Sequence, residues 1–325
     1  MRLTEINQEK YPVISKEEAI ERIKNLSETF IEKLKTTLYI TKCEEVNMVG
    51  LGNSLSSGWS ATDHDVRPFL LKLQAILQEE LDHSGVKIDF HNYSLCANNC
   101  NEEIYRFLLT NPSELDVKKR FQHDKQSWDY KFYKTFFQNY VPSDIACSYY
   151  PETEHRFLED YHSHSLTITH LNGCTGGILN AFSKNYPDKF LKILESYYED
   201  LEYLKMLILY LKSLKEQERN IITIGNFPYV STKLGWLMNG IILNMNKAIS
   251  KISEEELVYY FDKNQLAFFQ EFVNPETNKK ELKMDNHPTI EEQYTVLYYY
   301  FKTIIQILED RNKRHVRTDL KRIKQ

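Results

Sequence analysis

Residues 45–58 read EVNMVGLGNSLSSG, and this stretch decides the fold. Its first part, Glu45 to Gly50, is a short apolar run that predicts a buried strand. The Gly-, Asn- and Ser-rich part from Leu51 to Ser60 predicts a loop. An amphipathic run from Phe69 to Leu81 follows and is typical of a helix. A strand, a loop and a helix in this order form the repeating unit of an α/β fold.

The same alternation continues along the chain. Further strands are predicted where short apolar or alternating runs occur, at Val86–Phe90, Leu166–Leu171, Ile221–Ile224 and Leu257–Phe261. Helices are predicted around them at Lys16–Lys35, Glu102–Leu109, Asp188–Glu216, Trp236–Ile252 and Thr289–Leu308. Strands that alternate with helices predict a mostly parallel sheet covered on both faces, which is a three-layer α/β/α sandwich.

Two of the predicted helices begin with a capping box. Ser15 stands three residues before Glu18, and Thr289 stands three residues before Glu292. In this pattern the hydroxyl and the carboxylate each accept a hydrogen bond from the backbone N–H of the other residue. The first and last helices are therefore expected to start just after Ser15 and Thr289.

One segment departs from the alternation. Residues 112–163 are rich in Phe, Tyr, Trp and charge without a clear period. We interpret them as an insertion beside the active site, whose aromatics form either a lid or substrate wall or the core of a helical subdomain. Residues 1–310 are expected to form a single domain that includes this insertion, and residues 311–325 a basic C-terminal tail.

The composition is that of a folded, soluble chain. Its 325 residues are 42% hydrophobic and 27% charged, with a net charge of −5, so nothing attracts the whole molecule to nucleic acid or anionic lipid. The basic tail from Arg311 to Lys324 is the exception. It is either a solvated helix end or a contact for phosphate or an acidic partner, and no nucleic-acid partner is expected.

The cysteines and the first residues indicate a cytoplasmic protein. Five cysteines scattered along a long chain do not form a disulfide framework. Cys96 and Cys100 lack a second ligand pair with zinc spacing, so no metal site is predicted. Residues 1–10 contain no apolar run, and no stretch is long enough to span a membrane. The sequence leaves the oligomeric state open.

A serine follows the first predicted strand, at the point where α/β folds bind ligands. The loop reads Gly52-Asn53-Ser54-Leu55-Ser56-Ser57-Gly58, and ligands bind doubly wound sheets at the carboxyl ends of the strands. The flanking glycines allow close approach of a substrate. Ser54 is therefore the candidate nucleophile. The alternative is an ordinary turn, because Gly, Asn and Ser are common turn formers.

A nucleophilic serine needs a base within hydrogen-bond reach, and that base needs an orienting acid. The chain offers Asp285-Asn286-His287-Pro288-Thr289, directly before the last predicted helix. We predict His287 as the base and Asp285 as the acid. The alternative is a turn closed by Pro288 that caps the helix.

Together, the two motifs resemble the GDSL/SGNH hydrolase superfamily. Gly52 to Ser56 with Gly58 resembles its first block, with Asn53 in place of aspartate, and Asp285 with His287-Pro288 resembles its last block. The superfamily usually has two residues between acid and base where this sequence has one, so Glu281 or another acid is an alternative partner of His287. The resemblance covers most of the chain and implies a flavodoxin-like SGNH hydrolase fold.

The resemblance also implies groups that stabilise an oxyanion. Residues 92–99 resemble the second block, with Ala97 at the position of a glycine that donates its backbone N–H. The third block carries an asparagine, and in an ungapped alignment Cys174 falls on that position. Asn172, Asn98 and Asn99 are the alternatives for this side chain. The candidate oxyanion and substrate-binding residues are Asn53, Ala97, Asn98, Asn99 and Asn172.

The function implied by the resemblance is hydrolysis of a carboxylic ester through a Ser54 acyl-enzyme. The expected substrates are small-acyl esters, O-acylated carbohydrates or lysophospholipids, and the reaction needs no cofactor or metal. The alternative is a catalytically weak or inactive SGNH-fold protein that binds a ligand or a protein partner. Cys174 at the asparagine position and the short acid–base spacing motivate this alternative.

Overall fold

The computed structural model describes residues 12–52, 69–92, 94, 165–172, 190–213, 218–224, 235–262, 271–274, 279–282 and 288–323. The helices in these ranges are α1 (Lys16–Lys24), α2 (Ser27–Thr41), α3 (Phe69–Ser84), α10 (Phe190–Ser213), α11 (Gly235–Glu255) and α12 (Ile290–Ile323). The strands are β1 (Glu45–Leu51), β2 (Ile88–Asn92), β3 (Ser165–Asn172), β4 (Glu218–Ile224), β5 (Tyr259–Phe261), β6 (Glu271–Asn274) and β7 (Lys279–Leu282).

Five strands form one parallel sheet in the order β2-β1-β3-β4-β5. This is the strand order of flavodoxin-like folds, and it confirms the predicted α/β class. The chain moves from β1 outward to β2 and then returns to the other side of β1 with β3. The order therefore reverses between β1 and β3, and such a reversal opens a crevice at the carboxyl ends of the strands.

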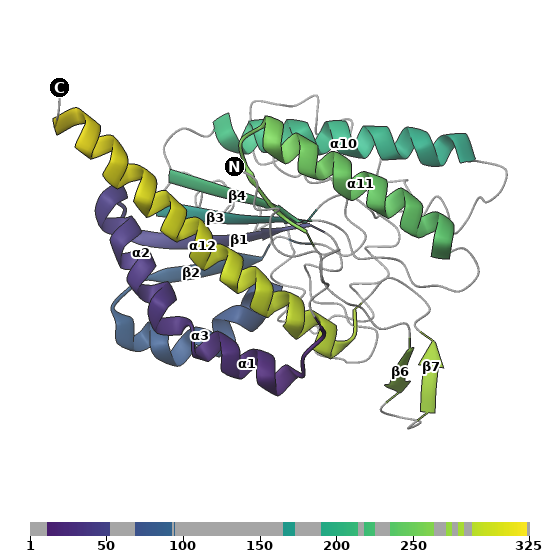
Figure 1. Ribbon diagram of the computed structural model, residues 1–325, viewed down its shortest axis with the longest axis horizontal. Helices are drawn as coiled ribbons and strands as arrows, with labels where there is room; N and C mark the ends of the chain where they lie inside the picture. Colours follow the sequence, from purple (N-terminus) through teal and green to yellow (C-terminus); the bar gives the residue numbers. More distant parts are fainter. Residues whose placement is uncertain are drawn as a thin grey trace, which may run out of the picture.

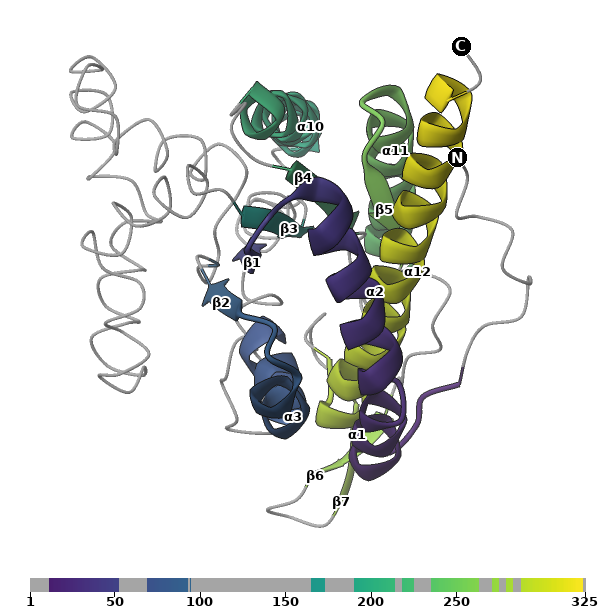
Figure 2. The same ribbon diagram turned by 90° about the vertical axis from the view of Figure 1, so that its left-hand side faces the viewer.

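Helices cover both faces of the sheet (Figure 1). Alternate strand residues point to opposite faces. Met48 and Ile168, which are paired in register, belong to the core shared with α1, α2, α3 and α12. Thr223 points to the other face, where its hydroxyl lies 2.6 Å from that of Ser253 in α11. Figure 2 shows the sheet between these two sets of helices, as predicted for a three-layer sandwich.

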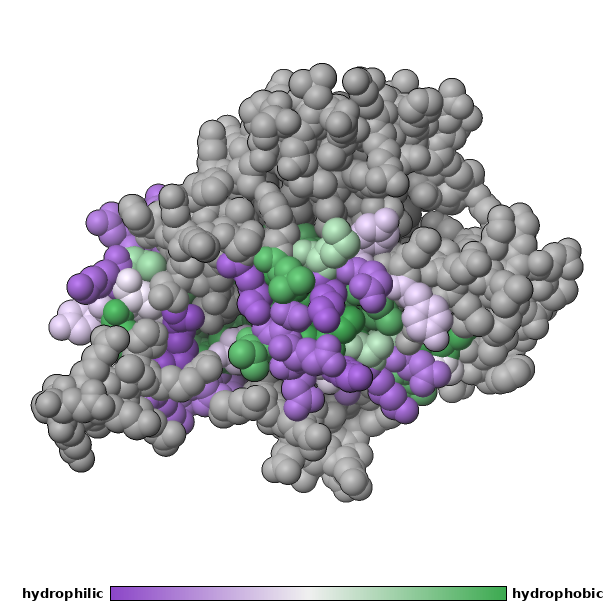
Figure 3. Space-filling view, turned by 90° about the horizontal axis from the view of Figure 1, so that it is seen from above, coloured by the Kyte–Doolittle hydropathy of each residue, from purple (hydrophilic) through white to green (hydrophobic). Residues whose placement is uncertain are grey.

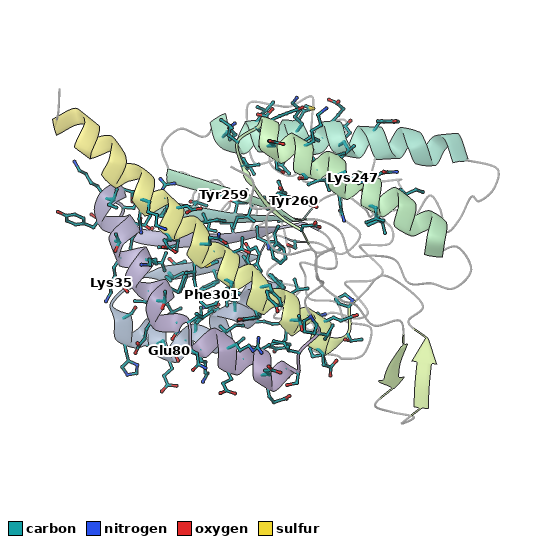
Figure 4. The ribbon with its side chains drawn as sticks, viewed as in Figure 1. Lys35, Glu80, Lys247, Tyr259, Tyr260 and Phe301 are labelled. Carbon is teal, nitrogen blue, oxygen red and sulfur yellow. The ribbon has the colours of Figure 1, made fainter. Side chains whose placement is uncertain are left out.

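The core on the first face centres on α12. Tyr300, Phe301 and Ile304 of this helix are fully buried. Phe301 points from α12 toward α2 (Figure 4), where its ring meets that of Phe30 edge-on at a centroid distance of 5.0 Å. Aromatic pairs prefer this T-shaped arrangement. The last helix thus holds the N-terminal helices against the sheet.

The single helix predicted from Lys16 to Lys35 is wrong in one respect, because the chain breaks it into α1 and α2. The N–H of Leu26 donates to the Ile23 carbonyl, a contact one residue shorter than an α-helical one. The Ser27 hydroxyl then donates to the Lys24 carbonyl at 2.7 Å. The side chain thus satisfies a backbone group that the break releases.

The prediction also ended the last helix too early. It was expected to stop at Leu308, but α12 continues to Ile323 and includes most of the basic tail. Charged residues are good helix formers, and Glu309 and Lys313 form an ion pair of 2.8 Å one turn apart. The sequence prediction had no strands after β5, whereas β6 and β7 form a separate antiparallel pair.

The outer surface mixes apolar and polar side chains. Seen from above in Figure 3, hydrophobic and hydrophilic residues of the described part lie interspersed. Helices α10 and α11 carry exposed large hydrophobic side chains, namely Tyr198, Met206, Leu209 and Leu243. Among the described helices, none combines the length and the apolar character that a membrane span requires.

Candidate functional site

The strand that leads to Ser54 ends in a backbone conformation that favours glycine. β1 stops at Leu51, and Gly52 has φ of +140°. Side chains with a Cβ rarely adopt such an angle. Asn53 and Ser54 follow directly in the sequence but lie outside the described residues. The chain therefore leaves the sheet at the carboxyl end of β1, next to β3.

Asn172 is the predicted site residue whose backbone the structure describes. It is the last residue of β3, and the residue before it, Leu171, pairs with Leu51 of β1. Asn172 therefore ends β3 at the level of Gly52, which follows β1. The other predicted oxyanion and substrate-binding residues lie outside the described residues: Asn53 after β1, and Ala97, Asn98 and Asn99 after β2.

The residues after His287 form a buried helix cap. Pro288 and Thr289 are both buried. The Thr289 N–H donates to Oε2 of Glu292 at 2.7 Å, and the Glu292 N–H donates to Oγ1 of Thr289 at 3.3 Å. The capping box predicted here is confirmed. His287 and Asp285 lie outside the described residues, but the point where the chain enters α12 is fixed.

The first turns of α3 and α12 are joined by a buried lysine. Lys72 is 2% exposed, and its Nζ donates to Oε1 of Gln293, which is also buried. The same Nζ lies 5.8 Å from the centroid of the Tyr294 ring, within the range of a cation–π contact. A buried cation requires such partners, because losing water is costly for a charge.

The segment before α1 meets α12 at the same end. The Ile14 N–H donates to Oγ1 of Thr295 at 3.0 Å, and that hydroxyl donates to the Ile14 carbonyl at 3.3 Å. Lys16 lies 5.2 Å from the centroid of the Tyr294 ring. The beginnings of α1, α3 and α12 therefore converge, and Figure 1 shows the start of α12 on the side of the molecule where the strands end.

His170 is a core residue. Its side chain is 2% exposed, and its ring lies 5.1 Å from Phe69 and 5.0 Å from Tyr300, between centroids. The structure thus places this histidine in the core rather than on the surface. Burial also raises the pKa of Tyr300 above its usual range, because the phenolate form would lose its hydration.

Two features of the site were not predicted. Lys72 and Gln293 were missed, although a lysine at a core-facing position of the apolar run that starts at Phe69 was a visible signal. In the part of the chain that the structure describes, no cluster of three or more His, Cys, Asp or Glu is arranged to hold a metal ion. The described side chains instead link the first turns of α3 and α12 by the Lys72–Gln293 hydrogen bond.

The chain matches no protein-family profile, and no curated protein matches its sequence. Several solved structures align with the chain. The acetylxylan esterase Axe2 from Geobacillus stearothermophilus aligns with a TM-score of 0.39 and 13% identity, over 80% of this chain and 93% of the esterase. A catalytic mutant of that esterase aligns over the same shares, with a TM-score of 0.42 and 13% identity.

A second protein, a GDSL-like lipase from Parabacteroides merdae, aligns with a TM-score of 0.41 and 12% identity. That alignment covers 81% of this chain and 97% of the lipase. In the sequence, Ser54 follows β1 and His287 precedes α12.

Proposed function

We propose that this protein is a serine hydrolase that cleaves a carboxylic ester, with Ser54 as nucleophile and His287 as base. One observation carries the proposal. Ser54 follows the end of β1, where the strand order reverses, and His287 directly precedes the buried cap of α12 in the sequence. The first turns of the two helices that follow these segments are hydrogen-bonded to each other.

The proposed reaction has two halves. His287 takes the proton of the Ser54 hydroxyl as the oxygen attacks the acyl carbon, and the tetrahedral intermediate then expels the alcohol, which receives the proton from His287. Water, activated by His287, then attacks the acyl-enzyme and releases the acid. Asp285 orients His287, with Glu281 as the alternative acid. No cofactor takes part.

An oxyanion forms in both halves and needs preorganised donors. The backbone N–H groups of Ser54 and Ala97 are the proposed main-chain donors. Asn172 is our choice for the side-chain donor, because it ends β3 directly beside the strand that leads to Ser54. Asn98 and Asn99 are the alternatives, and Asn53 is proposed to contact the substrate.

The proposed substrates are small-acyl esters, O-acylated carbohydrates and lysophospholipids. A fluorophosphonate tests the mechanism before the natural ester is known, because it reacts with an activated serine. Stoichiometric labelling of the wild-type chain is expected, and its loss in both Ser54→Ala and His287→Ala. Ser56→Ala, in the same loop, is the matched control and should still be labelled.

A folded wild-type protein that remains unlabelled would contradict the proposal. It would favour the alternative, a non-catalytic SGNH-fold protein that binds a ligand or partner in the same crevice. Labelling that persists in Ser54→Ala would place the reactive serine elsewhere. Mass spectrometry of the labelled peptide distinguishes these outcomes directly.

A further inference from the structure

Lys72 occupies a position where the sequence pattern calls for an apolar side chain. Along α3, the core-facing residues Phe69, Leu73 and Ile76 are all buried, and Lys72 lies among them with 2% of its surface exposed. An apolar residue of similar volume would fill this place without the cost of burying a charge. The lysine therefore contributes something that packing alone does not, namely a directed hydrogen bond.

The partner of this hydrogen bond is equally specific. Nζ of Lys72 donates to Oε1 of Gln293, and the Tyr294 ring lies beside the same Nζ. Gln293 is 4% exposed, so the bond is shielded from water. Hydrogen bonds that involve a charge are shorter and stronger than neutral ones. The bond therefore fixes the relative position of the two helices more tightly than apolar contacts do.

The bond joins the first turns of α3 and α12, which are the ends of these helices nearest in sequence to Ser54 and His287. Lys72 lies in the first turn of α3, which begins at Phe69 and is the first described element after Ser54 in the sequence. Gln293 lies in the first turn of α12, which follows His287. Met48 of β1 and Leu73 of α3 belong to the same core. Because Ser54 follows β1 and His287 directly precedes the cap of α12 in the sequence, a shift of α12 relative to α3 would move the base relative to the serine.

We propose that Lys72 and Gln293 are positioning residues, whose hydrogen bond sets the separation between Ser54 and His287. This inference rests on the proposed function. Proton transfer requires the serine oxygen and the histidine nitrogen about 2.6–3.2 Å apart. A misplacement of about 1 Å costs on the order of 10²-fold in rate. A buried bond between the two helix starts controls the rate without touching the substrate.

The test compares kcat and KM of full-length variants toward p-nitrophenyl acetate. Lys72→Met and Gln293→Met each remove the bond and should lower kcat about tenfold or more, with KM near the wild-type value. Gln293→Glu keeps an acceptor for Lys72 and should restore most of kcat. The double variant Lys72→Met/Gln293→Met should be no slower than either single variant, because the residues act through one bond.

Stability is measured on the same variants by urea denaturation. The double variant replaces the polar pair by apolar side chains of similar size and should fold normally, yet remain slow. Thr37→Val is the matched control, because it removes the buried hydrogen bond of 2.9 Å between Thr37 and Asn312 that joins α2 to α12 farther along the helix. It should lower stability and leave kcat unchanged.

The outcomes separate the two proposals. A wild-type protein that hydrolyses the ester, together with a folded double variant of unchanged kcat, would overturn the positioning role and leave the proposed function standing. A fall in kcat that tracks loss of stability, and that Thr37→Val reproduces, would also overturn it. A folded wild-type protein without hydrolysis or fluorophosphonate labelling would overturn both.

Discussion

Thr289 and Glu292 cap α12 reciprocally, each accepting a hydrogen bond from the backbone of the other. Glu292 is fully buried and Thr289 is 1% exposed, so neither backbone N–H has ready access to water in place of its partner. The cap therefore fixes the turn that follows His287. The contributions of this cap, of Gly52 and of Tyr300 to stability, and that of Asn172 to catalysis, can be measured directly.

Replacing Glu292 by alanine should destabilise the fold. The change leaves the buried Thr289 N–H without its acceptor, which costs about 1–3 kcal/mol of the free energy of unfolding. Glu292→Gln retains an acceptor oxygen and should cost less. Urea denaturation measures both, and Glu291→Ala in the same turn is the control. Equal effects of the Glu291 and Glu292 changes would contradict the capping role.

Gly52→Ala should lower both stability and esterase activity. At φ of +140°, a Cβ introduces backbone strain of about 1–3 kcal/mol, which the chain relieves by shifting the segment that leads to Ser54. The measurements are urea denaturation and kcat toward p-nitrophenyl acetate. Gly240→Ala is the control, because Gly240 lies in α11 with no atom near its added Cβ.

Gly52→Ala and Gly240→Ala should change the stability of the fold in opposite directions. In the helical position, alanine should stabilise the fold by about 0.5–1 kcal/mol and leave kcat unchanged. A Gly52→Ala protein as stable and as active as wild type would show that the conformation at the end of β1 does not matter.

Tyr300→Phe should make the protein more resistant to alkali. Because burial raises the pKa of Tyr300 above its unfolded value, near 10.0, the unfolded chain loses this proton first as pH rises. The contribution of Tyr300 to stability is therefore complete below about pH 10 and falls above it. The change to phenylalanine removes the part of this alkaline loss of stability that Tyr300 causes. Tyr260 accounts for a further part of the alkaline loss of stability, because burial and Asp262 raise its pKa as well.

The measurement for Tyr300→Phe is the urea midpoint between pH 8 and 11. The Tyr300 hydroxyl is buried and has no hydrogen-bond partner in the described part of the chain, so its removal should also raise stability by about 1 kcal/mol at neutral pH. Tyr39→Phe, at a site 87% exposed, should change neither value. If the urea midpoint of Tyr300→Phe falls between pH 8 and 11 as steeply as that of the wild type, Tyr300 does not cause the alkaline loss of stability.

Asn172→Ala should lower kcat by about 10²–10³-fold, the typical loss of one oxyanion donor. KM should change little, because the donor acts on the oxyanion of the transition state. The comparison with Asn98→Ala and Asn99→Ala decides among the three candidates. If Asn98→Ala or Asn99→Ala gives the large loss instead, the side-chain donor comes from the segment after β2.

The sheet was predictable because its signals are local. Each strand is a short apolar run between turn formers, and the pattern at Glu45–Gly50 became β1 with one added residue. The break after Lys24 was not predictable from periodicity, since the apolar spacing continues through it. Only the bonds at Leu26 and Ser27 show it. The end of α12 was also not predictable from periodicity. The apolar pattern stops at Leu308, but good helix formers such as Glu309 and Lys313 continue the helix beyond it.

The helix cap next to the candidate site was predictable, and the hydrogen bond that joins its helix to α3 was not. The Thr289–Glu292 cap is a local motif and was found, whereas the Lys72–Gln293 bond joins residues far apart in the chain and has no local signature. A lysine inside an apolar run is a hint, but its partner depends on which helix packs there. Ser54, Asp285 and His287 remain predictions, because they lie outside the described residues.

The direct pairing of β1 with β3 has a consequence for how the chain tolerates change. Leu51 and Leu171 are neighbours in the sheet, although β2 and the residues up to 164 lie between them in the sequence. Closing a long flexible loop costs only about 0.6 kcal/mol more for each doubling of its length. A change in the length of the sequence between β2 and β3 should therefore cost the sheet little stability.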